Sequence, residues 1–171
     1  MKRKYNIALI PTEKAQSIIQ CADFLSAIAD RYLLGINSFP HVTLCQFEAN
    51  ESDIKSIWEK ACNEIHQKSI ELTFEEFSCI SFDEIIFWVS LLPDHRDVLI
   101  QMHAVIAGIV NKSIKSNYDP HLTLINTKDS TYENLVDKLT ARYAPIQDAF
   151  VLALGRSDEI GQLIEVISSC R

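Results

Sequence analysis

Pro40-His41-Val42-Thr43-Leu44 is the stretch that decides the fold, because the chain repeats it as Pro120-His121-Leu122-Thr123-Leu124. Each copy is predicted to begin a strand directly after its proline, since proline presets an extended backbone and has no N–H to donate within a sheet. Alternate side chains of a strand share a face, so the histidine and threonine of each copy point one way and the two apolar residues the other. Each strand therefore offers a polar pair to a groove and an apolar pair to the core.

The elements around the two copies follow the same order: strand, helix, motif strand, helix, strand. Apolar residues spaced by three and four predict the helices, the first with a stripe from Ile18 to Tyr32 and an end at Gly35. The predicted strands are 5–10, 41–49, 70–74, 85–92, one from His121, 150–154 and 163–167.

This order predicts an α+β fold in which residues 1–171 form a single bilobal domain. Its halves, about 1–80 and 81–171, are expected to be two lobes related by a pseudo-twofold axis, each with an antiparallel sheet and outer helices. If the motif strands lie near that axis, both His/Thr pairs face one groove.

Composition and charge narrow the classes of partner. With 171 residues, 47% of them apolar, the chain can bury a core. Its net charge of −7 argues against duplex DNA or long RNA as a partner and leaves a small nucleotide or a nucleic-acid end open. No apolar run is long enough for a membrane span or a signal peptide, so no membrane partner is expected. The five cysteines lack C-x-x-C spacing, which favours reduced thiols and a cytoplasmic location. We expect a monomer.

The two motifs resemble those of the 2H phosphoesterase superfamily, which includes 2'-5' RNA ligase-like proteins and cyclic nucleotide phosphodiesterases. Further similar segments are Asn6-Ile7-Ala8-Leu9-Ile10-Pro11, Phe87-Trp88-Val89 and Leu154-Gly155-Arg156-Ser157. The resemblance implies a bilobal fold with the motifs on central strands, and a metal-independent mechanism without a cofactor. The residues after the motifs, Cys45-Gln46-Phe47 and Ile125-Asn126-Thr127, leave the branch of the family and the substrate open.

Cleavage of a phosphodiester explains why histidine and threonine occur together in these motifs. A base must take a proton from the attacking water or hydroxyl, and an acid must protonate the departing oxygen; histidine can do either near neutral pH. His41 and His121 are therefore the predicted acid and base, with their individual roles open, and Thr43 and Thr123 the predicted hydroxyl donors to the phosphate oxygens. The predicted substrate is a 2',3'-cyclic phosphate or 2'-5' linkage of a nucleotide or RNA terminus, and cleavage and ligation both stay open.

Four further residues are candidates for substrate binding. Phe47 is expected on the histidine face of its strand, and Tyr118 lies three residues before His121. Trp88 is either a platform for a base or a core residue. Arg156 is either a phosphate contact or a solvated turn residue.

Two alternatives to a metal-independent enzyme remain. One is a non-catalytic nucleotide or RNA-end binding protein with the same groove. The other is a metal-dependent hydrolase, although no H-x-x-x-H pattern or Cys/His cluster supports a zinc site. The remaining histidines, His66, His95 and His103, are interpreted as surface or structural residues.

Overall fold

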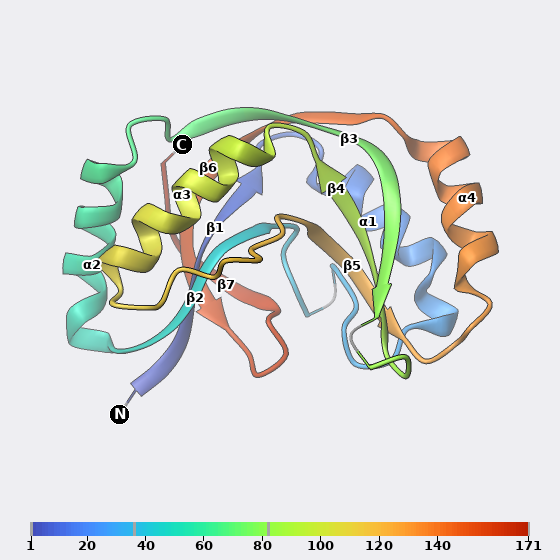
Figure 1. Cartoon of the computed structure of the whole chain (residues 1–171), viewed down its shortest axis with the longest axis horizontal. Helices are drawn as coiled ribbons and strands as arrows, with labels where there is room; N and C mark the ends of the chain where they lie inside the picture. The colour runs from blue at the N-terminus through green and yellow to red at the C-terminus, as the bar shows by residue number, and fades with distance from the viewer. Residues whose placement is uncertain (1, 36, 82, 171) are drawn as a thin grey trace.

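The computed structural model describes residues 2–35, 37–81 and 83–170. Its strands are β1 (Lys2–Pro11), β2 (Val42–Asn50), β3 (Ser69–Ser81), β4 (Phe87–Pro93), β5 (Leu122–Thr127), β6 (Ile146–Ser157) and β7 (Leu163–Ser169). They form one antiparallel sheet in the order β2-β1-β6-β3-β4-β5, with β7 paired to β6 (Figure 1). The predicted α+β class with antiparallel pairing is confirmed.

The strand order is symmetric. Exchanging β1 with β4, β2 with β5 and β3 with β6 returns the same order read backwards. The two halves join where Ser69–Phe74 of β3 pairs with Ile146–Val151 of β6. The pseudo-twofold relation expected from the repeated motif therefore exists, but it runs through a single continuous sheet.

The first helix of each half packs on the motif strand of the other half. Helix α1 (Ala15–Phe24) contacts β5, and α3 (Arg96–Ile109) contacts β2. Helix α2 (Glu51–Glu64) packs on α3 and β2, while α4 (Tyr132–Tyr143) packs on β3. Figure 1 shows α2 and α3 on the left and α1 and α4 on the right. The halves are thus interleaved, and the division of 1–171 near residue 80 stays a prediction.

The prediction of one long helix up to Tyr32 is wrong. Helix α1 ends at Phe24 and a short 3₁₀ turn, Ser26–Ile28, follows it. The chain then runs beside β5, where Asp30 and Leu34 donate backbone hydrogen bonds of 2.8 and 2.9 Å to β5 carbonyls. These bonds cover the edge of β5, and they bring buried Tyr32 next to a motif strand.

The apolar members of the two motifs lie in the core, as strand alternation predicts. Val42, Leu44, Leu122 and Leu124 are all buried. They belong to one large apolar cluster, which is formed by buried residues of the sheet and of the helices. No helix in the described part of the chain has the length and apolar character required to cross a membrane.

Candidate active site

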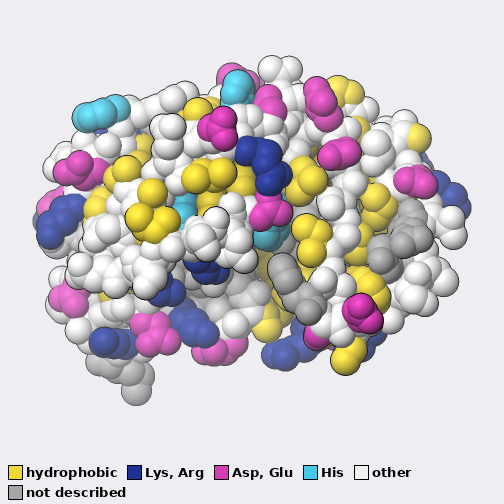
Figure 2. Space-filling model, viewed as in Figure 1, with side chains coloured by type: hydrophobic (Ala, Val, Ile, Leu, Met, Phe, Trp, Pro, Cys, Tyr) yellow, Lys and Arg dark blue, Asp and Glu magenta, His cyan; other side chains and the backbone are white. Residues whose placement is uncertain are grey.

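The two motif strands β2 and β5 meet at a pocket of about 570 Å³. All four predicted catalytic side chains line it, together with Trp88 and Tyr118. The other lining residues are Tyr32, Gln46, Ile80, Lys115, Asn117, Asp119, Ile160 and Gly161. Figure 2 shows one face of the molecule, with histidine atoms near its centre beside lysine or arginine and acidic atoms.

Both motif histidines are held in the same way. The Nδ1 atom of His41 lies 2.7 Å from the Phe39 carbonyl, and Nδ1 of His121 lies 2.7 Å from the Asp119 carbonyl. A carbonyl only accepts hydrogen bonds, so Nδ1 carries the proton in each ring. When the ring is neutral, Nε2 is therefore the unprotonated nitrogen. The two rings thus have matching tautomers at one pocket.

The two histidines differ in burial. His41 is buried, and burial lowers its pKa to about 4. The hydrogen bond to the Phe39 backbone raises the pKa of His41 but offsets only part of the effect of burial. The charge of His121 lowers the pKa of His41 further, because the two rings are close enough to interact. His121 is exposed. The site therefore combines a ring that stays neutral well below pH 7 with a ring open to solvent.

Thr43 is oriented by a neighbouring strand. The buried amide of Asn6, on β1, donates a 3.0 Å hydrogen bond from Nδ2 to Oγ1 of Thr43. Because that hydroxyl oxygen is already an acceptor, its own proton is available for a group in the pocket. Half-buried Thr123 occupies the corresponding place in the second motif.

Each motif strand contains a β-bulge at its leucine. In β2, Thr43 pairs with Ala8 and Cys45 with Ile7, so Leu44 is an extra residue. In β5, the residue without a partner is Leu124. A bulge reverses the alternation of side chains beyond it. Gln46 consequently lies on the pocket side of its strand.

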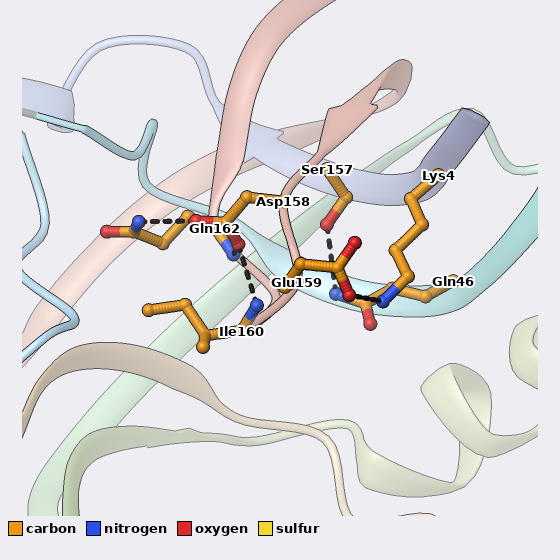
Figure 3. A network of polar contacts seen from close by, with 7 residues as sticks. All are labelled: Lys4, Gln46, Ser157, Asp158, Glu159, Ile160 and Gln162. Atoms are coloured by element: carbon orange, nitrogen blue, oxygen red, sulfur yellow. Dashed lines mark hydrogen bonds and ion pairs between the residues drawn. The ribbon is translucent and has the colours of Figure 1, made fainter.

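The loop between β6 and β7 contributes Ile160 and Gly161 to the lining of the pocket. Figure 3 shows the polar contacts that hold this loop. The Asp158 carboxylate accepts hydrogen bonds of 3.0 and 2.8 Å from the backbone N–H groups of Ile160 and Gln162. Gln46 donates from Nε2 to the Ser157 hydroxyl at 3.2 Å. Gly161 has φ of +93°, and a Cβ there would lie 2.9 Å from the Gln46 amide. The loop therefore needs glycine at this point to lie against the motif strand.

The family model of the 2'-5' RNA ligase superfamily matches residues 34–152, a span that contains both motifs. The chain belongs to this superfamily. A comparison with curated protein sequences gives no match.

Solved structures of this superfamily's fold confirm the expected 2H phosphoesterase architecture. The structure of Escherichia coli LigT complexed with 3'-AMP has a TM-score of 0.64 and 16% identity, and the match covers 100% of this chain and 97% of LigT. A structure described as a phosphoesterase gives a TM-score of 0.64 at 15% identity, covering 99% of this chain and 97% of the other. Usb1 of Kluyveromyces marxianus with uridine monophosphate gives 0.52 at 12% identity, covering 96% of both chains.

Two predicted substrate-binding residues of this superfamily member lie away from the pocket. Phe47 is buried and stacks on Tyr5 with ring centroids 5.9 Å apart, because the bulge at Leu44 turns it to the core face. Arg156 forms a 3.2 Å ion pair with Glu165, since its position on β6 is next to β7. It lines a separate groove with Lys2, Arg3 and Lys4. Phe47 is therefore not on the histidine face of its strand, contrary to the expectation from the sequence, and neither residue lines the pocket of the motif side chains. A substrate contact by either residue stays a prediction.

The other two candidates lie at the pocket. Trp88 is half-buried and meets Tyr32 edge to face at 5.8 Å. The Tyr118 hydroxyl donates a 2.6 Å hydrogen bond to the Thr43 carbonyl, and burial raises the pKa of this phenol. Tyr118 therefore also fixes the first motif strand.

Several pocket residues gave no signal in the sequence. Strand alternation from His41 predicts that Gln46 faces away from the pocket, and only the bulge turns it toward the pocket. The one regularity in the sequence is that Gln46 and Asn126 each lie five positions after a motif histidine. Lys115 and Asn117 come from the polar segment before the second motif, which carries no periodicity. Only the proximity of this segment to His121 in the sequence hinted at a role.

Proposed function

We propose that this chain is a metal-independent phosphodiesterase that acts on a 2',3'-cyclic phosphate or a 2'-5' linkage of a nucleotide or RNA end. One observation carries the proposal: two imidazoles with Nδ1 bound to carbonyls share a pocket with two threonine hydroxyls. The pocket volume lies within the range of about 300–1,000 Å³ that is typical of small-molecule sites. Solved structures of similar fold contain 3'-AMP in LigT and uridine monophosphate in Usb1.

The difference in burial supports different roles for the two histidines. His41 is neutral at pH 7 because its pKa is lowered to about 4, so its Nε2 accepts a proton from the attacking water. His121, in its protonated form, donates its Nε2 proton to the leaving ribose oxygen. The water oxygen forms a bond to phosphorus, the P–O bond to ribose breaks, and a phosphomonoester and a hydroxyl result.

The threonines act on the charge that develops in this step. Thr43, whose oxygen accepts from Asn6, donates its hydroxyl proton to a non-bridging phosphate oxygen. Thr123 does the same from the second strand. The two imidazoles supply both proton transfers, so the mechanism needs no metal. Joining of two RNA ends would use the same transfers with a 5'-hydroxyl in place of water. The base takes the proton of this hydroxyl, its oxygen bonds to the phosphorus of the cyclic phosphate, and the acid protonates the ribose oxygen whose bond to phosphorus breaks.

The test compares single-residue variants on 2',3'-cyclic nucleotides and 2'-5' oligoadenylate in the presence of EDTA. We expect turnover by the unmodified chain, and a loss of about 10²–10⁴-fold in kcat for His41→Ala and for His121→Ala. His66→Ala, which removes an exposed histidine outside the pocket, is the matched control and keeps full activity.

Three results would overturn this proposal. Activity that persists in both motif variants excludes the assigned roles. Activity that EDTA abolishes indicates a metal-dependent hydrolase. Nucleotide binding in calorimetry without turnover of any substrate identifies a nucleotide or RNA-end binding protein instead.

We also propose a monomer located in the cytoplasm. The five cysteines, all within the described residues, form no disulfide, which suits a reducing compartment. Light scattering tests the monomer, and imaging of a tagged chain tests the location.

A further inference from the structure

Lys115 is a cation without an ionic partner in the pocket. Apart from the histidines, the ionisable acidic and basic side chains at the pocket are Lys115 and Asp119, and Asp119 is paired with Arg96. No ion pair found within residues 2–35, 37–81 and 83–170 involves Lys115. A 2',3'-cyclic phosphate carries one negative charge, which the proposed function assigns to the two His/Thr pairs. The charge of Lys115 is therefore available to another anion.

The backbone of Lys115 is fixed by a buried histidine of α3. The Lys115 N–H donates to Nε2 of His103 at 3.2 Å, and Nδ1 of His103 donates to the Leu44 carbonyl at 2.6 Å. His103 is only 3% exposed, and both its ring nitrogens are used. The segment before the second motif is thereby tied to the bulge of the first motif strand.

A second contact strengthens this connection. The His103 ring stacks on Tyr118 with centroids 4.1 Å apart and planes at 9°, and the Tyr118 hydroxyl donates to the Thr43 carbonyl. Lys115 thus starts from an anchored backbone at the edge of the pocket, while its side chain is exposed. This arrangement supplies the edge of the pocket with a positive charge at low cost in backbone entropy.

We propose that Lys115 binds a second phosphate of the substrate, which makes the substrate an RNA end with a neighbouring phosphodiester and not an isolated nucleoside cyclic phosphate. The inference rests on the proposed function and names its substrate class. The side-chain amide of Asn117, which also lines the pocket, adds a neutral donor on the same segment. An exposed lysine–phosphate contact is worth up to about fivefold in affinity.

The test uses three substrates and three variants. The substrates are a nucleoside 2',3'-cyclic phosphate, a dinucleotide that ends in a 2',3'-cyclic phosphate, and the same dinucleotide with an uncharged methylphosphonate linkage. Lys115→Met removes the charge and Lys115→Arg keeps it. Lys112→Met removes an exposed lysine of the same segment that does not line the pocket.

Lys115→Met is expected to raise KM about three- to fivefold for the charged dinucleotide, with less than a twofold change in kcat. For the other two substrates KM changes less than twofold, and Lys115→Arg and Lys112→Met resemble the unmodified chain. The slope of log KM against log salt concentration becomes smaller by about 0.7 in Lys115→Met, as expected for one lost phosphate contact on a single strand. Equal effects of Lys115→Met on charged and uncharged dinucleotides would overturn the proposal.

A binding arm separates this inference from the proposed function. Calorimetry compares a dinucleotide 3'-phosphate with a nucleoside 3'-phosphate, for the unmodified chain and for Lys115→Met. Absence of hydrolysis of every substrate refutes the proposed function, yet a selective loss of dinucleotide affinity in the variant still supports the Lys115 site. An unchanged affinity refutes that site even if hydrolysis occurs.

Discussion

Acidification should destabilise this protein through His41. The ring is buried and its pKa falls from 6.5 to about 4 on folding, because burial disfavours its charged form. Below pH 6.5 the unfolded chain binds a proton at His41, whereas the folded chain binds it only near pH 4. The free energy of unfolding therefore decreases as the pH falls through this window. At about 1.4 kcal/mol per pKa unit, the loss amounts to about 3 kcal/mol.

The assay is urea unfolding of the unmodified chain and of His41→Asn at several pH values from 7.5 to 4. Asparagine keeps an amide that can donate toward the Phe39 carbonyl but does not titrate. The other ionisable groups are common to both proteins, so their pH effects cancel in the difference. We expect the unmodified chain to lose about 3 kcal/mol more than the variant between pH 7.5 and 4. Parallel pH profiles would refute the burial of a neutral ring at this position.

Three further substitutions test the surroundings of the site. Asn6→Ala removes the donor to the Thr43 hydroxyl. The loss of one hydrogen bond of about 1 kcal/mol predicts about fivefold lower kcat in steady-state kinetics, and an unchanged kcat would contradict this. Gly155→Ala would place a Cβ 2.2 Å from the Glu165 carbonyl, so urea unfolding should show a loss of about 1–3 kcal/mol, and unaltered stability would be inconsistent with the packing. His103→Phe keeps an aromatic ring but leaves the Leu44 carbonyl and the Lys115 N–H without their partner. The free energy of unfolding should fall by about 1–3 kcal/mol, and a stability equal to that of the unmodified chain would argue against both hydrogen bonds.

The motif strands could be predicted because their local pattern and their tertiary environment agree. His41 and Thr43 alternate with apolar residues, and the core buries Val42 and Leu44 as the alternation requires. The repeat of the pattern predicted a pseudo-twofold relation, which the symmetric strand order shows, but not that one sheet runs through both halves. These features depend on side chains two positions apart, which the sequence contains directly.

The errors arise where long-range contacts override the local pattern. The bulge at Leu44 depends on pairing with β1, so no local signal indicated that Phe47 faces the core. The stripe from Ile18 to Tyr32 has helical spacing, yet its last part gains more from hydrogen bonds to the edge of β5. His103 has no motif, and its position at two backbone groups follows only from the packing of α3 on β2.

A crystal structure with bound inorganic phosphate tests the central claim most directly, since two proton-transferring rings must contact one phosphate. The account predicts phosphate oxygens at hydrogen-bond distance, about 2.7–3.2 Å, from Nε2 of both His41 and His121, with the Thr43 and Thr123 hydroxyls beside them. A phosphate bound by only one of the imidazoles, or one found instead in the groove of Lys2, Arg3 and Lys4, would contradict it.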